Sequence, residues 1–306
     1  MIKVDNADLT GSHSASYPIG ETLPAETWRA QREAYLQRVS RWADDRVMRS
    51  QQHKRHPVYD FMFEYYSFRP AQLLRWTPGF GVTLAGASKQ DVEWEQFSFT
   101  EFGLALQAQA FPTHRISYLQ WCIEYLATVS ERAPLYSCYG LHEWAMVYKS
   151  EKLRYSSIPC RLGSACTDQF VEEVPIRCTH YDAYRFFTKE AKPLNRTDLE
   201  REQVMINDQP ACLHVNMDSY KFAYKIAPFC PSDVVGDAFL LAVAAREIDM
   251  RASPYDLTAF DVKPIKIETI DGRAEYVDLQ KELFLQGQAV RKRLLEVYSA
   301  LLHALS

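Results

Sequence analysis

The sequence has little glycine, no paired cysteine motif and no long apolar run. Only 11 of its 306 residues are glycine, against 15 prolines. Phosphate-binding loops and strand-dense barrels use glycine at their turns, so this scarcity argues against both. No apolar run approaches the roughly 18 residues that a membrane helix needs. The first ten residues lack the charged start and apolar run of a signal peptide. We therefore expect a protein with no membrane association.

The seven cysteines bear on the cellular compartment, and the net charge bears on the expected partner. No two cysteines form a C-x-x-C pair, and their number is odd. With no leader sequence, this pattern favours a reduced, cytoplasmic protein with free thiols. The formal net charge is −4. A nucleic-acid-binding protein needs a basic surface, but that surface can be local, so the total charge makes such a partner less expected without excluding it.

The composition and periodicity indicate a helical globular protein. Hydrophobic residues make up 47% of the chain and charged residues 24%, which is typical of a folded domain. We predict a mainly α fold: a flexible N-terminal arm over 1–23, then a single compact helical domain over 24–306 with a few short strands. The hairpin is placed over 265–276, around Asp271-Gly272. Helices are predicted over 24–50, 115–129, 140–149, 164–173, 181–189, 212–228, 231–249 and 275–304.

The predicted helix over 212–228 carries an unusual polar face. His214, Asp218, Lys221 and Lys225 are spaced four, three and four residues apart, which places them on one side of a helix. Aromatic residues occupy a neighbouring stripe. A surface helix has no need of this alignment, so we expect the segment to form the wall of an active site.

Three further segments place a histidine near a carboxylate among aromatic residues. Together with His214…Asp218, they are His56…Asp60, His142-Glu143 and His180…Asp182. One interpretation is a metal site, because histidine and carboxylates suit iron, manganese or zinc. However, no spacing matches a named motif, and the second histidine of H-E-x-x-H is missing after His142. The other interpretation is metal-free acid–base chemistry by a buried carboxylate.

Each of these segments also has a purely structural explanation. Thr179 and Asp182 have the spacing of a capping box. His56 can act as a helix N-cap before Pro57. Asp218 and Lys221 can be an ordinary exposed pair. His142 can be a hydrogen-bonded core residue.

A basic run between residues 46 and 55, with Arg69 beyond it, is the best candidate for contact with a phosphate backbone. Such cations bind DNA with an affinity that depends on salt. The aromatics that follow could stack on an unpaired base. The alternative is a solvated helix end, where positive charge also suits the helix dipole.

Several longer motifs carry a family resemblance that covers the chain from about residue 50 onward. They resemble a bacterial family labelled 3-methyladenine DNA glycosylase, and they are similar to anti-phage DNA glycosylases that act on modified bases. The resemblance implies hydrolysis of the N-glycosidic bond of a modified base, either an alkylated purine or the glucosylated hydroxymethylcytosine of phage DNA. The motifs are His56-Pro-Val-Tyr-Asp-Phe61, Tyr65-Tyr-Ser-Phe-Arg-Pro70, Gly140-Leu-His-Glu-Trp-Ala-Met146, Arg177-Cys-Thr-His-Tyr-Asp-Ala-Tyr-Arg-Phe-Phe187, Leu213-His…Met-Asp-Ser-Tyr-Lys221 and Asp249-Met-Arg-Ala-Ser-Pro-Tyr-Asp256.

Residue chemistry then assigns roles within that activity. Bond cleavage builds positive charge on the sugar, so a carboxylate is the expected catalyst, and a flipped base needs aromatic walls. The candidate catalytic residues are Asp218, Asp60, Glu143 and Asp182. Expected to contact the base are His142, His180, His214, Tyr59, Tyr65, Tyr66, Trp144 and Tyr181. Expected to contact phosphate are Arg49, Lys54, Arg55, Arg69, Lys221 and Lys225, and Lys221 or Lys225 would be the amine of a lyase.

The expected partner is double-stranded DNA containing a modified base, with no cofactor, no metal and no obligate protein partner. Two alternatives stay open. One is a metal-dependent hydrolase or oxidase of a small molecule that uses the histidines and carboxylates as ligands. The other is a non-enzymatic module that binds modified DNA. The sequence leaves open whether the protein serves repair or phage defence.

Overall fold

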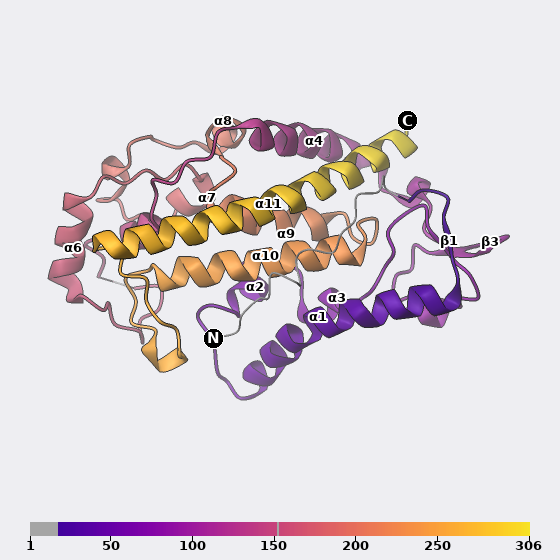
Figure 1. Ribbon diagram of the computed structural model, residues 1–306, viewed down its shortest axis with the longest axis horizontal. Helices are drawn as coiled ribbons and strands as arrows, with labels where there is room; N and C mark the ends of the chain where they lie inside the picture. The colour runs from indigo at the N-terminus through magenta and orange to yellow at the C-terminus, as the bar shows by residue number, and fades with distance from the viewer. Residues whose placement is uncertain (1–17, 152) are drawn as a thin grey trace. The chain divides into compact units, whose positions relative to one another are not determined.

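The computed structural model describes residues 18–306 except Lys152, and helices predominate over a small sheet (Figure 1). The mainly α class predicted from the sequence is confirmed. The chain divides into two compact units. Within the described residues, unit 1 comprises Thr128–Asp218 and Ala242–Gln288, and unit 2 comprises 18–127, Ser219–Leu241 and Ala289–Ser306. The predicted arm over 1–23 lies mostly outside the described residues.

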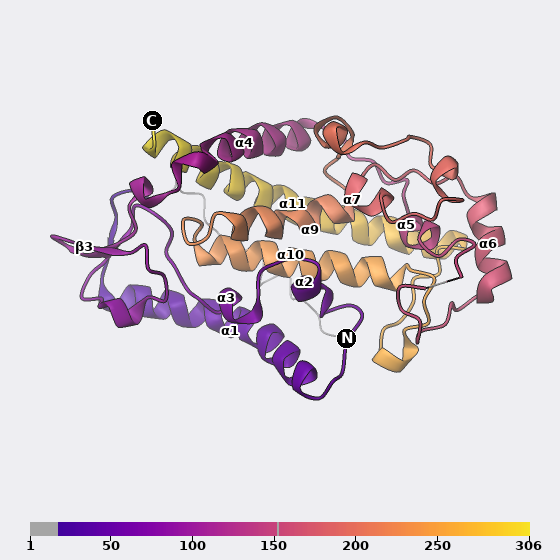
Figure 2. The ribbon, with the colours of Figure 1, turned by 180° about the vertical axis from the view of Figure 1, so that it is seen from behind.

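Unit 2 is organised around a long helix, α1 (Ala25–Gln51). Its aromatic stripe of Trp28, Tyr35 and Trp42 is buried, as the seven-residue spacing predicts. Two one-turn helices follow, α2 (Phe61–Glu64) and α3 (Pro70–Leu73). Helix α3 packs on α1, which can be followed in Figure 2.

A small four-stranded sheet completes the N-terminal part of unit 2. Its strands are β1 (Thr22–Leu23), β2 (Thr83–Leu84), β3 (Ser98–Thr100) and β4 (Gly103–Ala105), in the order β1-β2-β4-β3. β1 pairs parallel with β2, and the other two pairings are antiparallel. Gly103 adopts φ 143°, and an added Cβ would lie 2.4 Å from the carbonyl oxygen of Leu84, so the β3–β4 turn requires glycine.

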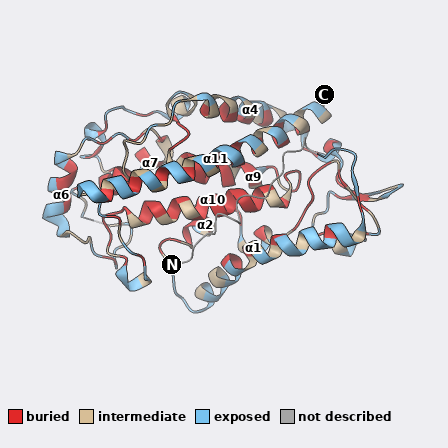
Figure 3. Ribbon diagram, in the orientation of Figure 1, coloured by how far each residue is buried: buried red, intermediate tan, exposed pale blue. Residues whose placement is uncertain are grey.

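Four helices contribute to both units. They are α4 (Ile116–Glu131), α9 (Leu213–Lys225), α10 (Ser232–Arg251) and α11 (Ile270–Ala304). Figure 3 shows α10 buried along nearly its whole length, whereas α1 keeps an exposed face. No helix among the described residues is both long and apolar enough to cross a bilayer.

The helices that belong to unit 1 alone are short. They are α5 (Leu141–Ala145), α6 (Gly163–Glu173), α7 (Tyr181–Tyr184) and α8 (Val204–Asn207). Short 3₁₀ turns connect elements in both units, at Lys89–Asp91, Ala108–Ala110, Thr113–Arg115, Lys192–Leu194, Arg201–Gln203 and Thr258–Phe260.

Two local predictions are wrong. The hairpin predicted around Asp271-Gly272 does not form, because helix α11 already begins at Ile270. The capping box predicted from Thr179 and Asp182 is absent. The N-cap of α7 is His180, and it makes no side-chain capping bond. Asp182 instead pairs with Arg185 one turn later, at 2.9 Å.

Candidate functional site

Three of the four histidine segments meet inside unit 1. His142 comes from α5, His180 precedes α7 and His214 comes from α9. The ring centroids of His142 and His214 are 4.5 Å apart, edge to face. Those of His180 and His214 are 5.4 Å apart and stacked. We call these three residues the histidine cluster.

The carboxylates that contact the histidine cluster come from distant parts of the chain. His142 Nε2 lies 2.5 Å from Asp249 Oδ1 on α10. His180 Nδ1 lies 3.1 Å from Asp208 Oδ1, just beyond α8, and His180 Nε2 lies 4.0 Å from Asp218 Oδ2 on α9. A carboxylate can only accept a hydrogen bond, so the contact with Asp208 places a proton on Nδ1 of His180 and leaves Nε2 directed toward Asp218.

Glu143 lies beside this cluster but is held by an arginine. Arg246 Nη1 donates to Glu143 Oε1 at 2.8 Å and to Asp249 Oδ2 at 2.5 Å, while Nη2 contacts the Tyr155 hydroxyl at 3.1 Å. Arg246, Glu143 and Asp249 are all buried. Glu143 therefore has a charge partner in the folded protein, as a buried carboxylate needs.

The histidines differ in their electrostatics. Burial alone would lower the pKa of His142, but the Asp249 carboxylate raises it well above its ordinary value. Burial and the neighbouring His142 lower the pKa of His214 well below its ordinary value. His214 Nδ1 has no hydrogen-bond partner among the described residues. One charged and one neutral imidazole thus lie side by side.

Two groups bring three possible metal ligands together. They are His142, His214 and Asp249, and His180, Asp182 and Asp218, with the ligand atoms of each group within 4.8 Å of one another. In the first group, a 2.5 Å hydrogen bond already joins His142 to Asp249. Ligand atoms of one ion lie about 3 Å apart or more, given bonds of about 2 Å. His142 and Asp249 of the first group are therefore a hydrogen-bonded pair, and of these two groups among the described residues the second keeps the wider spacing of a cation site.

The second group combines one half-exposed ligand with two buried ones. The side chain of Asp182 is 36% exposed, whereas Asp218 and His180 are each about 4% exposed. Asp218 is buried, so the interpretation of Asp218 and Lys221 as an exposed pair is wrong.

Of the aromatic residues expected at the base, two belong to unit 1. Trp144 is fully buried, and its indole Nε1 donates to the carbonyl oxygen of Ala252 at 2.8 Å. Tyr181 is half-buried and directly follows His180. Tyr181 is therefore the aromatic candidate closest in sequence to the half-exposed carboxylate of Asp182, while Trp144 packs in the core.

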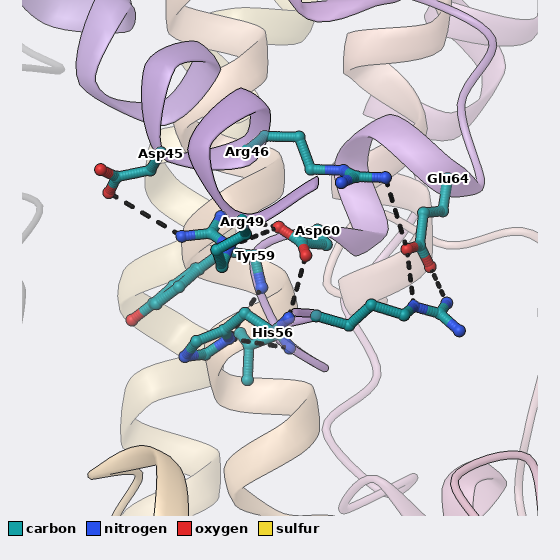
Figure 4. A network of polar contacts seen from close by, with 9 residues as sticks. Asp45, Arg46, Arg49, His56, Tyr59, Asp60 and Glu64 are labelled. Atoms are coloured by element: carbon teal, nitrogen blue, oxygen red, sulfur yellow. Dashed lines mark hydrogen bonds and ion pairs between the residues drawn. The ribbon is translucent and has the colours of Figure 1, made fainter. Parts of the chain in front are cut away.

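The fourth histidine segment lies in unit 2, and its groups bind one another (Figure 4). Arg49 donates to Asp60 Oδ1 from Nε at 2.9 Å and from Nη2 at 2.6 Å. The other carboxylate oxygen accepts the backbone N–H of His56 at 2.9 Å. Both oxygens of Asp60, a catalytic candidate, are thus occupied by hydrogen-bond donors.

His56 acts as a cap, as its structural explanation proposed, although on a turn that precedes α2. Its Nδ1 accepts the backbone N–H groups of Val58 and Tyr59, at 3.3 and 3.4 Å. Burial, assisted by the charge of Arg49, lowers the pKa of His56 to about 4. A neutral ring suits an atom that accepts hydrogen bonds.

The other unit 2 candidates pack locally. The Tyr59 ring stacks on His56 at 4.5 Å, Tyr65 stacks on Phe61 at 5.0 Å, and Tyr66 is buried.

Of the residues expected to contact phosphate, Arg49 and Arg55 form ion pairs with Asp60 and Glu64. Lys54, Arg69 and Lys225 are exposed and Lys221 is half-buried. The ammonium of Lys225 lies 5.5 Å from the ring of Tyr118.

A separate cavity of about 550 Å³ lies within unit 2. It is bounded by α1, the first turn of α10 and the last third of α11, and its polar walls include Arg38, Asp233 and Arg293. Arg293 forms ion pairs with Asp233 and Asp237, and Arg38 with Asp237. None of the histidine cluster lines this cavity, so the hollow and the acid–base groups belong to different parts of the chain.

Sequence reasoning missed Asp208, Asp249, Arg246 and Cys138. The strongest available signal was Arg246 and Asp249, which are charged residues three apart that follow the apolar run over 238–245 of helix α10. Full burial of such a pair requires a partner on another element. Asp208 and Cys138 lie in irregular segments, where no periodic pattern predicts which way a side chain points.

Comparison with known proteins identified no relative. No protein-family model, no curated protein and no solved structure matches the chain.

Proposed function

We propose that the protein is a DNA glycosylase that hydrolyses the N-glycosidic bond of a modified base in double-stranded DNA and leaves an abasic site. The observation that carries this proposal is the contact of a buried carboxylate, Asp218, with His180, whose other ring nitrogen is bonded to Asp208. Glycosyl transfer needs a carboxylate beside the sugar and a proton donor or acceptor near it. The resemblance of the surrounding motifs to glycosylases favours the same activity.

In the proposed reaction, Asp218 stabilises the positive charge that develops at C1′ and accepts a proton from the attacking water. The oxygen of the water bonds to C1′ as the bond from C1′ to the base breaks; the electron pair of that bond goes to the base, and the proton taken up by Asp218 is passed on to the base. His180, held in one orientation by Asp208, hydrogen-bonds the departing base or the water. Tyr181, next to the half-exposed Asp182, would stack on the extruded base. We place the reaction in the cytoplasm, where the seven free cysteines stay reduced.

The direct test offers the purified protein duplexes that each contain one methylated, deaminated or glucosylated base, followed by treatment with alkali. Alkali cleaves the strand at an abasic site, so breaks with one duplex alone would name the substrate base. Breaks before alkali would indicate an additional lyase step, for which Lys221 or Lys225 would supply the amine. Intact strands with every duplex would overturn the proposal.

A second candidate function is a metal-dependent hydrolase or oxidase of a small molecule. It is favoured by the group of His180, Asp182 and Asp218, whose ligand atoms lie within 4.8 Å of one another. The bond of His180 Nδ1 to Asp208 is the type of second contact that orients metal-binding histidines. Elemental analysis of the purified protein separates the two candidates. Stoichiometric iron, manganese or zinc that is lost in an Asp218→Ala variant would favour the second.

A further inference from the structure

A chain of contacts in unit 1 ends at a cysteine that neither candidate function uses. Cys138 Sγ lies 3.3 Å from Nδ1 of His142, and Nε2 of the same ring lies 2.5 Å from Asp249 Oδ1. The remaining oxygen of Asp249 accepts from Arg246 at 2.5 Å. A thiol, an imidazole and a buried carboxylate in this order are the parts of an activated nucleophile.

The backbone around Cys138 fixes the sulfur in place. Tyr139 and Gly140 both adopt left-handed conformations, with φ of 51° and 76°. A Cβ at Gly140 would lie 3.1 Å from Cβ of Ala252, a tight contact, and the φ of 76° would strain a residue with a side chain. The turn closes with a 2.9 Å bond from the N–H of Leu141 to the carbonyl of Cys138. A tyrosine held in this uncommon conformation indicates that the turn is strongly determined by its surroundings.

The charges around the sulfur favour its ionised form. Burial opposes ionisation, but the positive charge of His142 and the backbone N–H groups of His142 and Gly140 lower the pKa of Cys138. The other titratable groups that act on the sulfur are Cys178, Cys212 and Tyr276, and burial raises the pKa of each. They therefore stay neutral, and Cys138 is the thiol of this group that ionises.

We propose that Cys138 is a nucleophilic thiolate, held by His142 and Asp249, and that it reacts with small peroxides. This inference is independent of base excision and of any metal at the group of His180, Asp182 and Asp218. Cys138 is partly exposed, and hydrogen peroxide is neutral and little larger than water. A thiolate of this kind is the species that peroxides oxidise.

The reaction balances with hydrogen peroxide as the only oxidant. The sulfur of Cys138 attacks one peroxide oxygen, an S–O bond forms and the O–O bond breaks. The departing hydroxide takes the proton from His142 Nδ1 and leaves as water. The sulfur is oxidised by two electrons to a sulfenic acid, and the peroxide is reduced. A second cysteine thiol that condenses with this sulfenic acid would give a disulfide and release a further water.

The first test measures the rate at which iodoacetamide alkylates Cys138 in the native wild-type protein, followed by peptide mass spectrometry. From pH 8.5 to pH 5.5 an ordinary thiol with a pKa of about 8.5 slows several-hundredfold, because its thiolate disappears. We expect the rate at Cys138 to fall far less than several-hundredfold over this range, because the lowered pKa keeps more of its sulfur ionised. A rate that falls as steeply as that of glutathione, or no labelling of Cys138 before unfolding, would overturn the proposal.

Experiments with variants and with hydrogen peroxide then show whether Cys138 is an activated thiolate or only an accessible thiol. Asp249→Asn removes the charge that keeps His142 protonated, so the alkylation rate at Cys138 should regain its dependence on pH. With hydrogen peroxide and dimedone, the wild type should carry the sulfenic-acid adduct on Cys138. The adduct should be lost in Cys138→Ser and kept in Cys166→Ser, which removes an exposed cysteine of α6. An adduct confined to Cys166 would contradict the inference.

Discussion

Two parts of the molecule contain a histidine and an aspartate four residues apart, and they use the pair in different ways. In unit 2, Asp60 bonds the backbone of His56 and the guanidinium of Arg49, and the ring of His56 caps a turn. In unit 1, Asp218 contacts His180 instead of the His214 that precedes it by one turn. The same spacing therefore gives a closed structural network in one unit and a carboxylate with a histidine neighbour in the other.

The difference shows that partners on other elements decide what a histidine–carboxylate pair does. Arg49 neutralises Asp60 and helps to lower the pKa of His56 to about 4. In unit 1, Arg246 is bonded to Glu143 and Asp249, and Asp218 contacts His180. We therefore assign the proposed chemistry to Asp218, and we expect Asp60 to maintain the fold.

The largest expected effect is on activity and follows substitution of Asp218. Asp218→Asn keeps the size of the side chain but removes the charge that would stabilise the sugar cation. We expect the rate of base excision to fall about 10³-fold, the scale of a lost acid–base group, while the melting temperature changes little. Single-turnover kinetics on the duplex identified by alkali cleavage measures this. The matched control is Asp182→Asn, which removes the half-exposed carboxylate and should cost less than tenfold. Equal losses would contradict the assignment.

The next largest effect is on stability and follows the replacement of an aspartate by asparagine in unit 2, at Asp60. Asp60→Asn leaves Arg49 without its buried charge partner, and we expect the free energy of unfolding to drop by about 3 kcal/mol. Urea unfolding followed by circular dichroism measures the change. Asp45→Asn is the control, because Asp45 is 48% exposed and 3.9 Å from Arg49, and its loss should cost less than about 0.5 kcal/mol. If Asp60→Asn abolished excision in a fully stable protein, Asp60 would be catalytic after all.

The sequence could predict the local relations within the candidate site but not the contacts between distant segments. Helical periodicity correctly placed His214 and Asp218 on one face of α9, because that relation is local. The recurrence of a histidine near a carboxylate identified the three histidines that meet in unit 1. It could not pair His142 with Asp249, 107 residues away, because a contact of that kind depends on tertiary packing. The hairpin predicted at Asp271-Gly272 failed for a related reason: a local turn signal lies inside the first turn of α11, where helix formation continues through it.

A smaller effect concerns pH and tests the neutral state of His56. Its pKa is about 4 in the folded protein and about 6.5 when unfolded, so unfolding takes up as much as one proton between these values. This contribution to the free energy of unfolding is intact above pH 6.5 and declines toward pH 4. Its slope is at most about 1.4 kcal/mol per pH unit, and less because the ring is partly exposed. His142 has a raised pKa, so its contribution runs the other way and is lost as the pH rises.

The variant His56→Asn isolates this contribution, because its amide oxygen can still accept the backbone N–H groups of Val58 and Tyr59. Urea titrations of both proteins at pH 7.0, 5.5 and 4.5 would show the stability difference changing in favour of the variant as the pH falls. A difference that is constant across the series would mean that His56 titrates normally in the folded state.

The smallest effect separates packing from substrate recognition at Trp144. The sequence placed this tryptophan at the base, and the structure buries it with its indole bonded to Ala252. Trp144→Phe removes that bond and part of the ring, so we expect a loss of about 1–2 kcal/mol in the free energy of unfolding. The KM for modified DNA should stay within about twofold, because no contact made by substrate is removed. Tyr181→Leu is the comparison: as a stacking residue it should raise KM severalfold at unchanged stability. The opposite result, with KM sensitive to Trp144 and insensitive to Tyr181, would mean that the base contacts the buried Trp144 instead of Tyr181.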